Sequence, residues 1–321
     1  MTAGSATPAA TTAPEVPPPA IRVRGLRKVF GSTVAVSGVD LDVPAGAVLG
    51  VLGPNGSGKT TMIRMLLALS RPTAGTVELL GAPMPAAAGA VLPHVGALVE
   101  GPGFHPFLSG RENLRRCAAA EPLLSTRAIP DAVQRALSRV GLTGAAERRY
   151  RAYSLGMKQR LGLAAALLVP RRLVILDEPP NGLDPAGTRD VRTIIAELHA
   201  SGATVLVSSH LLAEIEATCT HVAVLDHGSL IAAGPLAALL DGEAPALAVR
   251  TPDSATAVQA LRAAGIDVAI CPAGVRVELA GTDPPTVVAL LVGAGVAVHE
   301  VQRRRTELDE LFAQLTGGHS Q

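Results

Sequence analysis

A glycine-rich run with a single lysine, residues 53–61, has the residue types that bind phosphate. Its pattern is Gly53-x4-Gly58-Lys59-Thr60. Small residues let backbone N–H groups face an anion at a helix start, the lysine reaches the β- and γ-phosphates, and the threonine hydroxyl can ligate magnesium. The alternative is a glycine-rich surface turn, but with only three lysines in the chain a chance match would be rare. We expect nucleotide contacts from the whole run: Gly53, Pro54, Asn55, Gly56, Ser57, Gly58, Lys59, Thr60 and Thr61.

Two adjacent carboxylates, Asp177 and Glu178, follow an apolar run at residues 173–176. A strand that ends in this way delivers its acids to the edge of an α/β sheet where ligands bind. Taken alone, two acids after a strand only mark the start of a loop. With the phosphate loop, they predict that Asp177 holds magnesium through water and that Glu178 polarises an attacking water. Both motifs together are typical of a P-loop nucleotidase, and the absence of the guanine-specifying Asn-Lys-x-Asp favours ATP.

The elements that must position these motifs alternate between strands and helices. Residues 47–52 predict a buried strand before the phosphate loop, and the helical pattern after it runs through Leu69 and stops at Pro72. Further strands are predicted at 76–80, 173–176, 204–208 and 221–225, and helices at 154–169, 186–199 and 235–240. This alternation predicts an α/β fold with a mostly parallel, helix-covered sheet. Residues 21–30 and 34–43 alternate apolar and polar positions and predict an additional antiparallel β layer.

Residues 101–152 predict a mostly helical insertion between strands of the main sheet. Within it, Ser109 and Glu112 have the spacing of a capping box, and residues 131–140 are amphipathic. A tight turn at residues 226–228 is expected to lead to the last helix of this domain, near residues 235–240.

A composition shift at residues 241–245 marks a domain boundary. Beyond it, residues 246–321 predict a small α+β domain with the order β-α-β-β-α-β, which is ferredoxin-like. Its strands are expected at 247–250, near Val268, near Val275 and at 296–301, its helices at 255–264 and 286–293, with a charged helix from Thr306. No chemical motif lies in this part, so its role stays open.

Composition excludes several classes of protein. With 28 basic and 27 acidic side chains and a pI of 7.9, the chain has no basic surplus, which argues against nucleic acid as a partner. The three cysteines are few and widely spaced, which favours a reducing compartment, the cytosol. Residues 1–20 are rich in Ala, Thr and Pro and predict a disordered tail, not a signal peptide. Residues 79–99 are uncharged, but three prolines, three glycines and a histidine argue against a membrane span.

The run Tyr153-Ser-Leu-Gly-Met-Lys-Gln-Arg160, upstream of the Asp-Glu strand, and Ser208-Ser-His210 downstream decide the kind of nucleotidase. With these residues, the chain over 21–240 resembles the ATP-binding subunit of ABC transporters. The resemblance implies an ATPase with the cofactors ATP and Mg²⁺ and a site that needs two chains, in a homodimer or a paired ATPase subunit.

Several residue roles follow from the resemblance alone. Phe30 would stack on adenine, against the alternative of a core phenylalanine at a strand end. Ser154 and Gly156 would contact the γ-phosphate bound by the opposite subunit, although Leu155 and Met157 depart from the commonest signature. Asp184 would lie in a loop that links the two sites. His210 would contact the γ-phosphate, so that the catalytic set is Glu178, His210 and Lys59.

Glu100 stands where the family usually has glutamine, in contact with magnesium, so the resemblance gives Thr60, Glu100 and Asp177 as the metal residues. Glutamate there is similar to the branch associated with bacteriocin and peptide-antibiotic immunity and with drug export. The resemblance therefore implies an exporter ATPase that is peripheral on the inner face of the cell membrane and drives a separate membrane permease. The alternatives are an importer ATPase and a soluble ABC ATPase that acts on ribosomes or DNA.

Overall fold

The computed structural model describes residues 18–99, 103–240, 246–279 and 281–304 of the 321-residue chain. Contacts divide the chain into two compact units. One consists of Met1–Ala47, Thr61–Leu176 and Pro180–Val205, and the other of Val48–Thr60, Asp177–Pro179 and Leu206–Gln321. Within the described ranges, no helix has both the length and the apolar character needed to cross a membrane.

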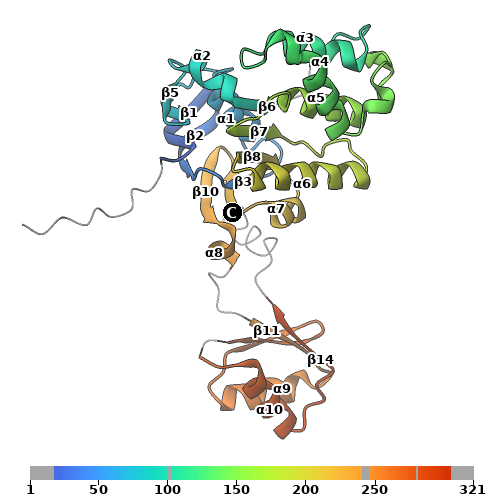
Figure 1. Ribbon diagram of the computed structural model, residues 1–321. Coiled ribbons are helices and arrows are strands. Elements are labelled where there is room, and N and C mark those ends of the chain that lie inside the picture. The colour runs from blue at the N-terminus through green and yellow to red at the C-terminus, as the bar shows by residue number, and fades with distance from the viewer. Residues whose placement is uncertain (1–17, 100–102, 241–245, 280, 305–321) are drawn as a thin grey trace, which may run out of the picture. The chain divides into compact units, whose positions relative to one another are not determined.

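Four strands form the expected antiparallel sheet, in the order β2-β1-β4-β5 (Figure 1). They are β1 (Ile21–Phe30), β2 (Thr33–Val43), β4 (Ala74–Leu79) and β5 (Ala82–Met84). Ile21 of β1 pairs with Val43 of β2 and with Leu79 of β4, and all three side chains are fully buried. The apolar positions of the alternating pattern thus lie on one face of the sheet. The antiparallel layer is confirmed, and β5 is a strand that the sequence pattern did not predict.

A second sheet has six strands in the order β10-β9-β3-β8-β7-β6. These are β3 (Val48–Leu52), β6 (Val95–Leu98), β7 (Leu173–Asp177), β8 (Thr204–Ser209), β9 (His221–Asp226) and β10 (Ser229–Pro235). β3 pairs in parallel with β9, and β6 pairs in parallel with β7. Every residue of β3, β7 and β8 is buried, as expected for strands covered on both faces. The parallel α/β sheet is confirmed.

The tight turn at residues 226–228 is confirmed, and a strand that was not predicted, β10, lies between it and the predicted helix. The turn closes a two-residue hairpin between β9 and β10, in which His227 and Gly228 have φ of 44° and 81°. Such positive angles suit the right-handed twist of antiparallel strands. The chain therefore enters β10 before it reaches the helix α8 (Leu236–Leu240).

The main helices of this part lie close to their predicted positions. They are α1 (Lys59–Leu66), α2 (Ala88–Val91), α3 (Gly110–Ala119), α4 (Ile129–Arg139), α5 (Leu155–Ala166), α6 (Pro185–Ala200) and α7 (Leu212–Thr218), of which α2 and α7 were not predicted. The expectation that α1 continues to Leu69 is wrong. Ala68 has a φ of 58°, in the left-handed region, which ends the helical hydrogen-bond pattern before the predicted stop. α5 likewise ends three residues before its predicted stop at Val169.

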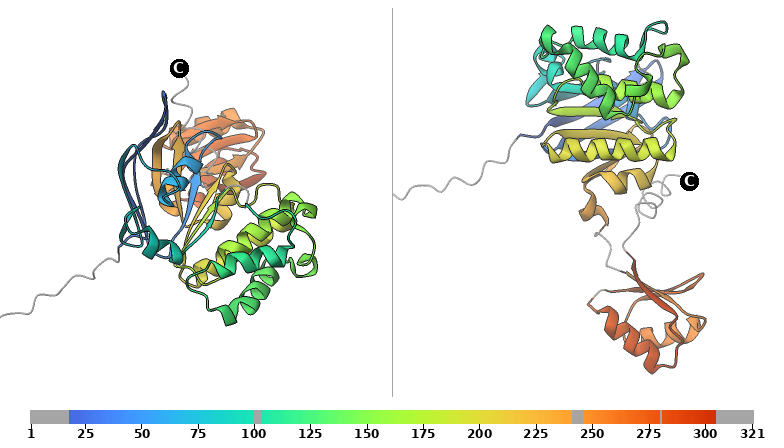
Figure 2. Two further views of the ribbon diagram at one scale, coloured as in Figure 1. Left: turned by 90° about the horizontal axis from the view of Figure 1, so that it is seen from above. Right: turned by 45° about the vertical axis from the view of Figure 1, so that its right-hand side comes forward.

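The segment that carries α3 and α4 is helical, as predicted, and has short 3₁₀ turns at Thr126–Ala128, Thr143–Ala145 and Tyr150–Ala152 (Figures 1 and 2). The Ser109 hydroxyl accepts the Glu112 N–H, and the Glu112 carboxylate accepts the Ser109 N–H. The capping box is therefore confirmed.

The final sheet contains four antiparallel strands in the order β12-β13-β11-β14. The elements in chain order are β11 (Ala246–Arg250), α9 (Ser254–Ala263), β12 (Val268–Cys271), β13 (Gly274–Glu278), α10 (Pro284–Gly293) and β14 (Glu300–Arg304). Figure 2 shows both helices on one face of this sheet. The β-α-β-β-α-β order and the ferredoxin-like topology are confirmed.

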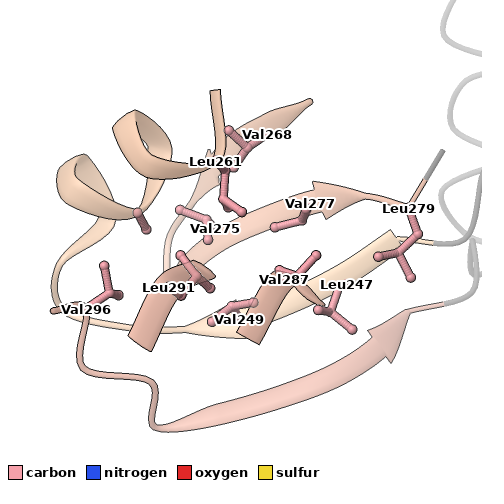
Figure 3. Close-up of a cluster of buried hydrophobic side chains, with 11 residues drawn as sticks. Leu247, Val249, Leu261, Val268, Val275, Val277, Leu279, Val287, Leu291 and Val296 are labelled. Carbon is pink, nitrogen blue, oxygen red and sulfur yellow. The ribbon is translucent and has the colours of Figure 1, made fainter. Parts of the chain in front are cut away.

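The core of this sheet and its helices consists of eleven residues between Leu247 and Val296 (Figure 3). Val249 and Val277 from the strands belong to the same cluster as Leu291 from α10. The strand predicted at 296–301 begins only at Glu300. Val296 is a buried loop residue whose N–H donates to the Leu291 carbonyl, so its apolar side chain belongs to the core and does not mark a strand. The predicted disordered tail and the charged helix from Thr306 fall almost wholly outside the described residues.

Candidate active site

The glycine-rich loop connects β3 to α1, as the sequence predicts. A side chain at Gly53 would overlap the Leu225 carbonyl oxygen, which lies at the end of β9, so only glycine fits. Gly58 has a φ of 101°, which allows the loop to turn into the helix. The Ser57 carbonyl accepts the Gly228 N–H at 3.0 Å, so the β9–β10 turn is hydrogen-bonded to the glycine-rich loop. The sequence analysis did not anticipate this contact.

Lys59 is a buried cation, with 5% of its side chain exposed. Its Nζ donates to the carbonyl oxygens of Gly53 at 2.7 Å and Pro54 at 3.1 Å. The same Nζ lies 3.6 Å from Oε1 of Glu178. The lysine is thus held within its own loop and directed toward the acid that follows β7.

Glu178 lies between two basic groups. One carboxylate oxygen faces Lys59, and the other lies 2.7 Å from Nδ1 of His210. Its backbone φ is 49°, an uncommon conformation for a residue other than glycine. Strained backbone of this kind turns a side chain in a direction that an extended strand would not allow. The structure therefore brings together Lys59, Glu178 and His210, which the sequence identified in three separate segments.

Asp177 is the last residue of β7 and is buried. Its Oδ1 accepts a hydrogen bond of 2.6 Å from the hydroxyl of Ser208, which lies near the end of the neighbouring strand β8. The same hydroxyl accepts the N–H of Glu178 at 2.9 Å. Sequence reasoning used Ser208 only as context for His210 and gave it no function. The available signal was a hydroxyl at the end of a strand next to the one that delivers the acids.

These residues suit a nucleotide with magnesium. The Ser57 hydroxyl is buried and, among the described residues, finds no hydrogen-bond partner, which is typical of a group that meets a ligand. The Thr60 hydroxyl and the Asp177 carboxylate are the hard oxygen ligands that Mg²⁺ prefers. No group of three or more His, Cys, Asp or Glu in the described ranges could hold a metal ion.

Phe30 ends β1 and is 53% exposed. This exposure rules out the alternative of a core phenylalanine. The ammonium of Lys28 lies over this ring, 4.7 Å from its centre, in a cation–π contact.

Ser154, Gly156 and Asp184 belong to the other compact unit. Ser154 caps α5 by accepting the Met157 N–H at 3.2 Å, and Asp184 caps α6 by accepting the Gly187 N–H at 2.8 Å. A side chain at Gly156 would come within 3.2 Å of Leu183, so the start of α5 lies against the loop before α6. Both Ser154 and Asp184 are exposed residues at helix starts, where anions are favoured. Glu100 lies outside the described residues.

A family model described as ABC transporter matches residues 36–181. The daunorubicin resistance ATP-binding protein DrrA3 of Streptomyces coeruleorubidus is 37% identical, over 93% of this chain and 96% of its own length. The chain belongs to the ATP-binding proteins of ABC transporters. The bacitracin transport ATP-binding protein BcrA of Enterococcus faecalis is 42% identical over 66% of this chain and 68% of that protein.

Solved structures agree with this ABC ATPase assignment. The structure of an ATP-binding subunit of an ABC transporter has a TM-score of 0.64 and 27% identity, and the match covers 69% of this chain and 92% of that one. A dimeric ATP-binding cassette in a post-hydrolysis state, bound to ADP and Pi, has a TM-score of 0.63 over 67% and 98% of the two chains. At 21% identity, the second match shows the fold alone. As an ABC ATPase, the chain binds and hydrolyses ATP. Subunits of this family dimerise and work with membrane permeases.

Proposed function

We propose that this ABC ATPase powers the export of a drug or an antimicrobial peptide, with two copies closing on two MgATP and driving a separate membrane permease. The names of its relatives support the direction and the substrate class, because they are a bacitracin transport protein and a daunorubicin resistance protein. The observation that supports the catalytic part is the Glu178 carboxylate, which lies between the Lys59 ammonium and the His210 imidazole.

In this proposal, the reaction uses the three side chains around Glu178. Lys59 binds the β- and γ-phosphates, where its fixed positive charge stabilises the negative charge of the transition state. The Glu178 carboxylate accepts a hydrogen bond from the attacking water. As the water oxygen bonds to the γ-phosphorus, the bond to ADP breaks and the proton of the water passes to this carboxylate. His210 holds that carboxylate through its Nδ1 and directs its other ring nitrogen toward the γ-phosphate. The residues of the 53–61 loop supply the remaining phosphate contacts.

Mg²⁺ would be held by the Thr60 hydroxyl and the Asp177 carboxylate, and it would neutralise phosphate charge. Glu100 completes this proposed metal set on the resemblance alone. Phe30 would stack on adenine, which its exposed ring permits.

The second copy would complete each site. Ser154 and Gly156 at the start of α5 are proposed to face the γ-phosphate bound by the other subunit, where the positive end of the helix dipole favours an anion. Asp184 would link the two sites because it caps α6 at the end of the loop that lies against the start of α5. The protein would be cytoplasmic and held at the inner face of the membrane by its permease.

The test is the substitution Glu178→Gln, which removes the negative charge and keeps the shape. We expect ATP binding to be retained, hydrolysis to fall by about 10²-fold or more, and an ATP-bound dimer to accumulate. Hydrolysis is measured by phosphate release, and the dimer by size-exclusion chromatography with ATP. Glu197→Gln is the matched control, because Glu197 pairs with Arg139 on an exposed surface and should leave all three properties unchanged.

The tagged Glu178→Gln protein then serves as bait in detergent extracts of native membranes. A polytopic membrane protein in stoichiometric amount is the expected companion. Normal turnover in Glu178→Gln would reject the catalytic assignment. Recovery of ribosomes or DNA without a membrane protein would instead reject the transport function and leave the ATPase assignment intact.

A further inference from the structure

Ser208 is a fully buried hydroxyl near the carboxyl end of β8. It is 0% exposed, and its Oγ makes hydrogen bonds to both acids of the site, as donor to one and as acceptor from the other. The O–H donates to Oδ1 of Asp177 at 2.6 Å, and the oxygen accepts the N–H of Glu178 at 2.9 Å. One hydroxyl therefore fixes the side chain of the last residue of β7 and the backbone N–H of the residue that follows it.

The bond to Asp177 determines how that carboxylate is oriented. With Oδ1 engaged by Ser208, the rotation of the buried carboxylate is restricted and Oδ2 remains the oxygen that can face a metal. Outer hydrogen bonds of this kind fix the ligand orientation that a metal site requires. A short bond of 2.6 Å to an ionised acceptor is among the stronger hydrogen bonds in proteins.

The bond to the Glu178 N–H acts on the backbone. Glu178 has a φ of 49°, which a residue with a side chain adopts only where its surroundings hold it. Ser208 provides such a constraint at the peptide nitrogen. This conformation places the Glu178 carboxylate 2.7 Å from His210, which lies two residues after Ser208.

We infer that Ser208 is a positioning residue for ATP hydrolysis, which sets the orientation of Asp177 and Glu178 together through a single hydroxyl. This inference rests on the proposed roles of those two acids. It assigns to β8 a second contribution besides His210, because the end of this strand places the histidine that contacts Glu178 and also orients both acids. Ser208 itself touches neither nucleotide nor metal in this account.

A purely structural role is the competing explanation, and the chain contains a control for it. Thr204 lies at the other end of β8, is 2% exposed, and its Oγ1 accepts the Gly46 N–H at 2.9 Å. Ser208 and Thr204 are thus buried hydroxyls on the same strand, and each satisfies one backbone N–H. Only Ser208 also bonds a carboxylate.

The experiment compares Ser208→Ala with Thr204→Ala in the full-length protein. In Ser208→Ala we expect kcat to fall by about 10- to 100-fold, the range found when outer-shell partners of metal ligands are removed. A second readout is the affinity for a fluorescent ATP analogue, measured with EDTA and with Mg²⁺. The affinity in EDTA should stay within about twofold of the wild type, and the gain produced by Mg²⁺ should shrink. Thr204→Ala should leave kcat and the Mg²⁺ gain unchanged.

A second pair of variants covers the possibility that Ser208→Ala does not fold. Ser208→Thr and Ser208→Val add nearly the same volume and differ in the hydroxyl, so packing effects cancel between them. Ser208→Thr should exceed Ser208→Val in kcat by about tenfold or more. Equal rates in this pair, or wild-type kcat and Mg²⁺ gain in Ser208→Ala, would overturn the inference. If Glu178→Gln still removes hydrolysis in that case, the proposed function stands and only the role of Ser208 fails.

Discussion

Lys59 and Cys219 are both buried, but their neighbours give the two side chains different chemical properties. Lys59 is buried but meets two carbonyl oxygens and a carboxylate, which compensate for the water that its ammonium has lost. Cys219 is buried without such partners among the residues that the structure describes, and burial raises the pKa of its thiol to about 12. The lysine is therefore suited to binding an anion, whereas the cysteine is suited to packing. Its sulfur approaches Gly50 of β3 so closely that a side chain there would lie within 2.9 Å of it.

Cys219 should be the last of the three cysteines to react with an alkylating reagent. The thiolate is the nucleophile, and because its pKa is raised, only a minute fraction of Cys219 is ionised at pH 8, a fraction that increases tenfold per pH unit up to about pH 12. Burial also blocks access. Labelling with iodoacetamide at pH 8, followed by peptide mass spectrometry, measures the three rates. Cys117 and Cys271 are the internal references, since both are partly exposed. Equal rates in the native protein would contradict this account, whereas equal rates in urea are expected.

Four helices in the described part of the protein begin with a side chain that caps the helix N-terminus. Ser109, Ser154, Asp184 and Asp283 each cap a helix by accepting a backbone N–H, and all four are residue types with strong capping preference. The caps at Ser154 and Asp184 coincide with residues proposed to act in the ATPase cycle. A side-chain oxygen that caps the start of a helix can therefore also hold that N-terminus where it meets an anion.

Ser109→Ala should lower the free energy of unfolding by about 1 kcal/mol, because it removes the hydroxyl that accepts the Glu112 N–H, one of the two bonds of the capping box. Urea denaturation followed by circular dichroism measures the loss. Ser125→Ala is the matched control, since Ser125 precedes a 3₁₀ turn without making a side-chain cap bond and should change stability by less than about 0.5 kcal/mol. Equal losses in the two variants would show that the box contributes nothing.

At the scale of the whole molecule, the residues after 245 supply a hydrophobic core of their own. Its eleven buried members all come from the span between Leu247 and Val296. The separate core supports the proposal that residues 246–321 form an accessory domain, distinct from the ATPase domain proposed for residues 21–240.

Leu291→Ala should destabilise this core by about 2–5 kcal/mol, the usual cost of emptying a fully buried leucine site. Val292→Ala is the control within α10, because Val292 is 60% exposed and should cost little. Differential scanning calorimetry of the full chain measures the result. If the core is independent, one transition moves to lower temperature in Leu291→Ala while ATP binding keeps its wild-type affinity. A shift of every transition together, or equal effects of the two variants, would contradict this.

The sequence determined whatever depends on neighbouring residues: the phosphate loop between a strand and a helix, the alternation along β1 and β2, the cap at Ser109 and the β-α-β-β-α-β order of the last six elements. These patterns are local, because periodicity and capping act within a few residues. Only the tertiary structure decided the contacts between distant segments. The bond from Ser208 to Asp177 joins residues 31 positions apart. Val296 is apolar because it packs in the core from a loop, and not because it belongs to a strand. A strand as short as β5 depends on pairing with its neighbour, and the orientation of a buried acid depends on which hydroxyl the packing brings to it.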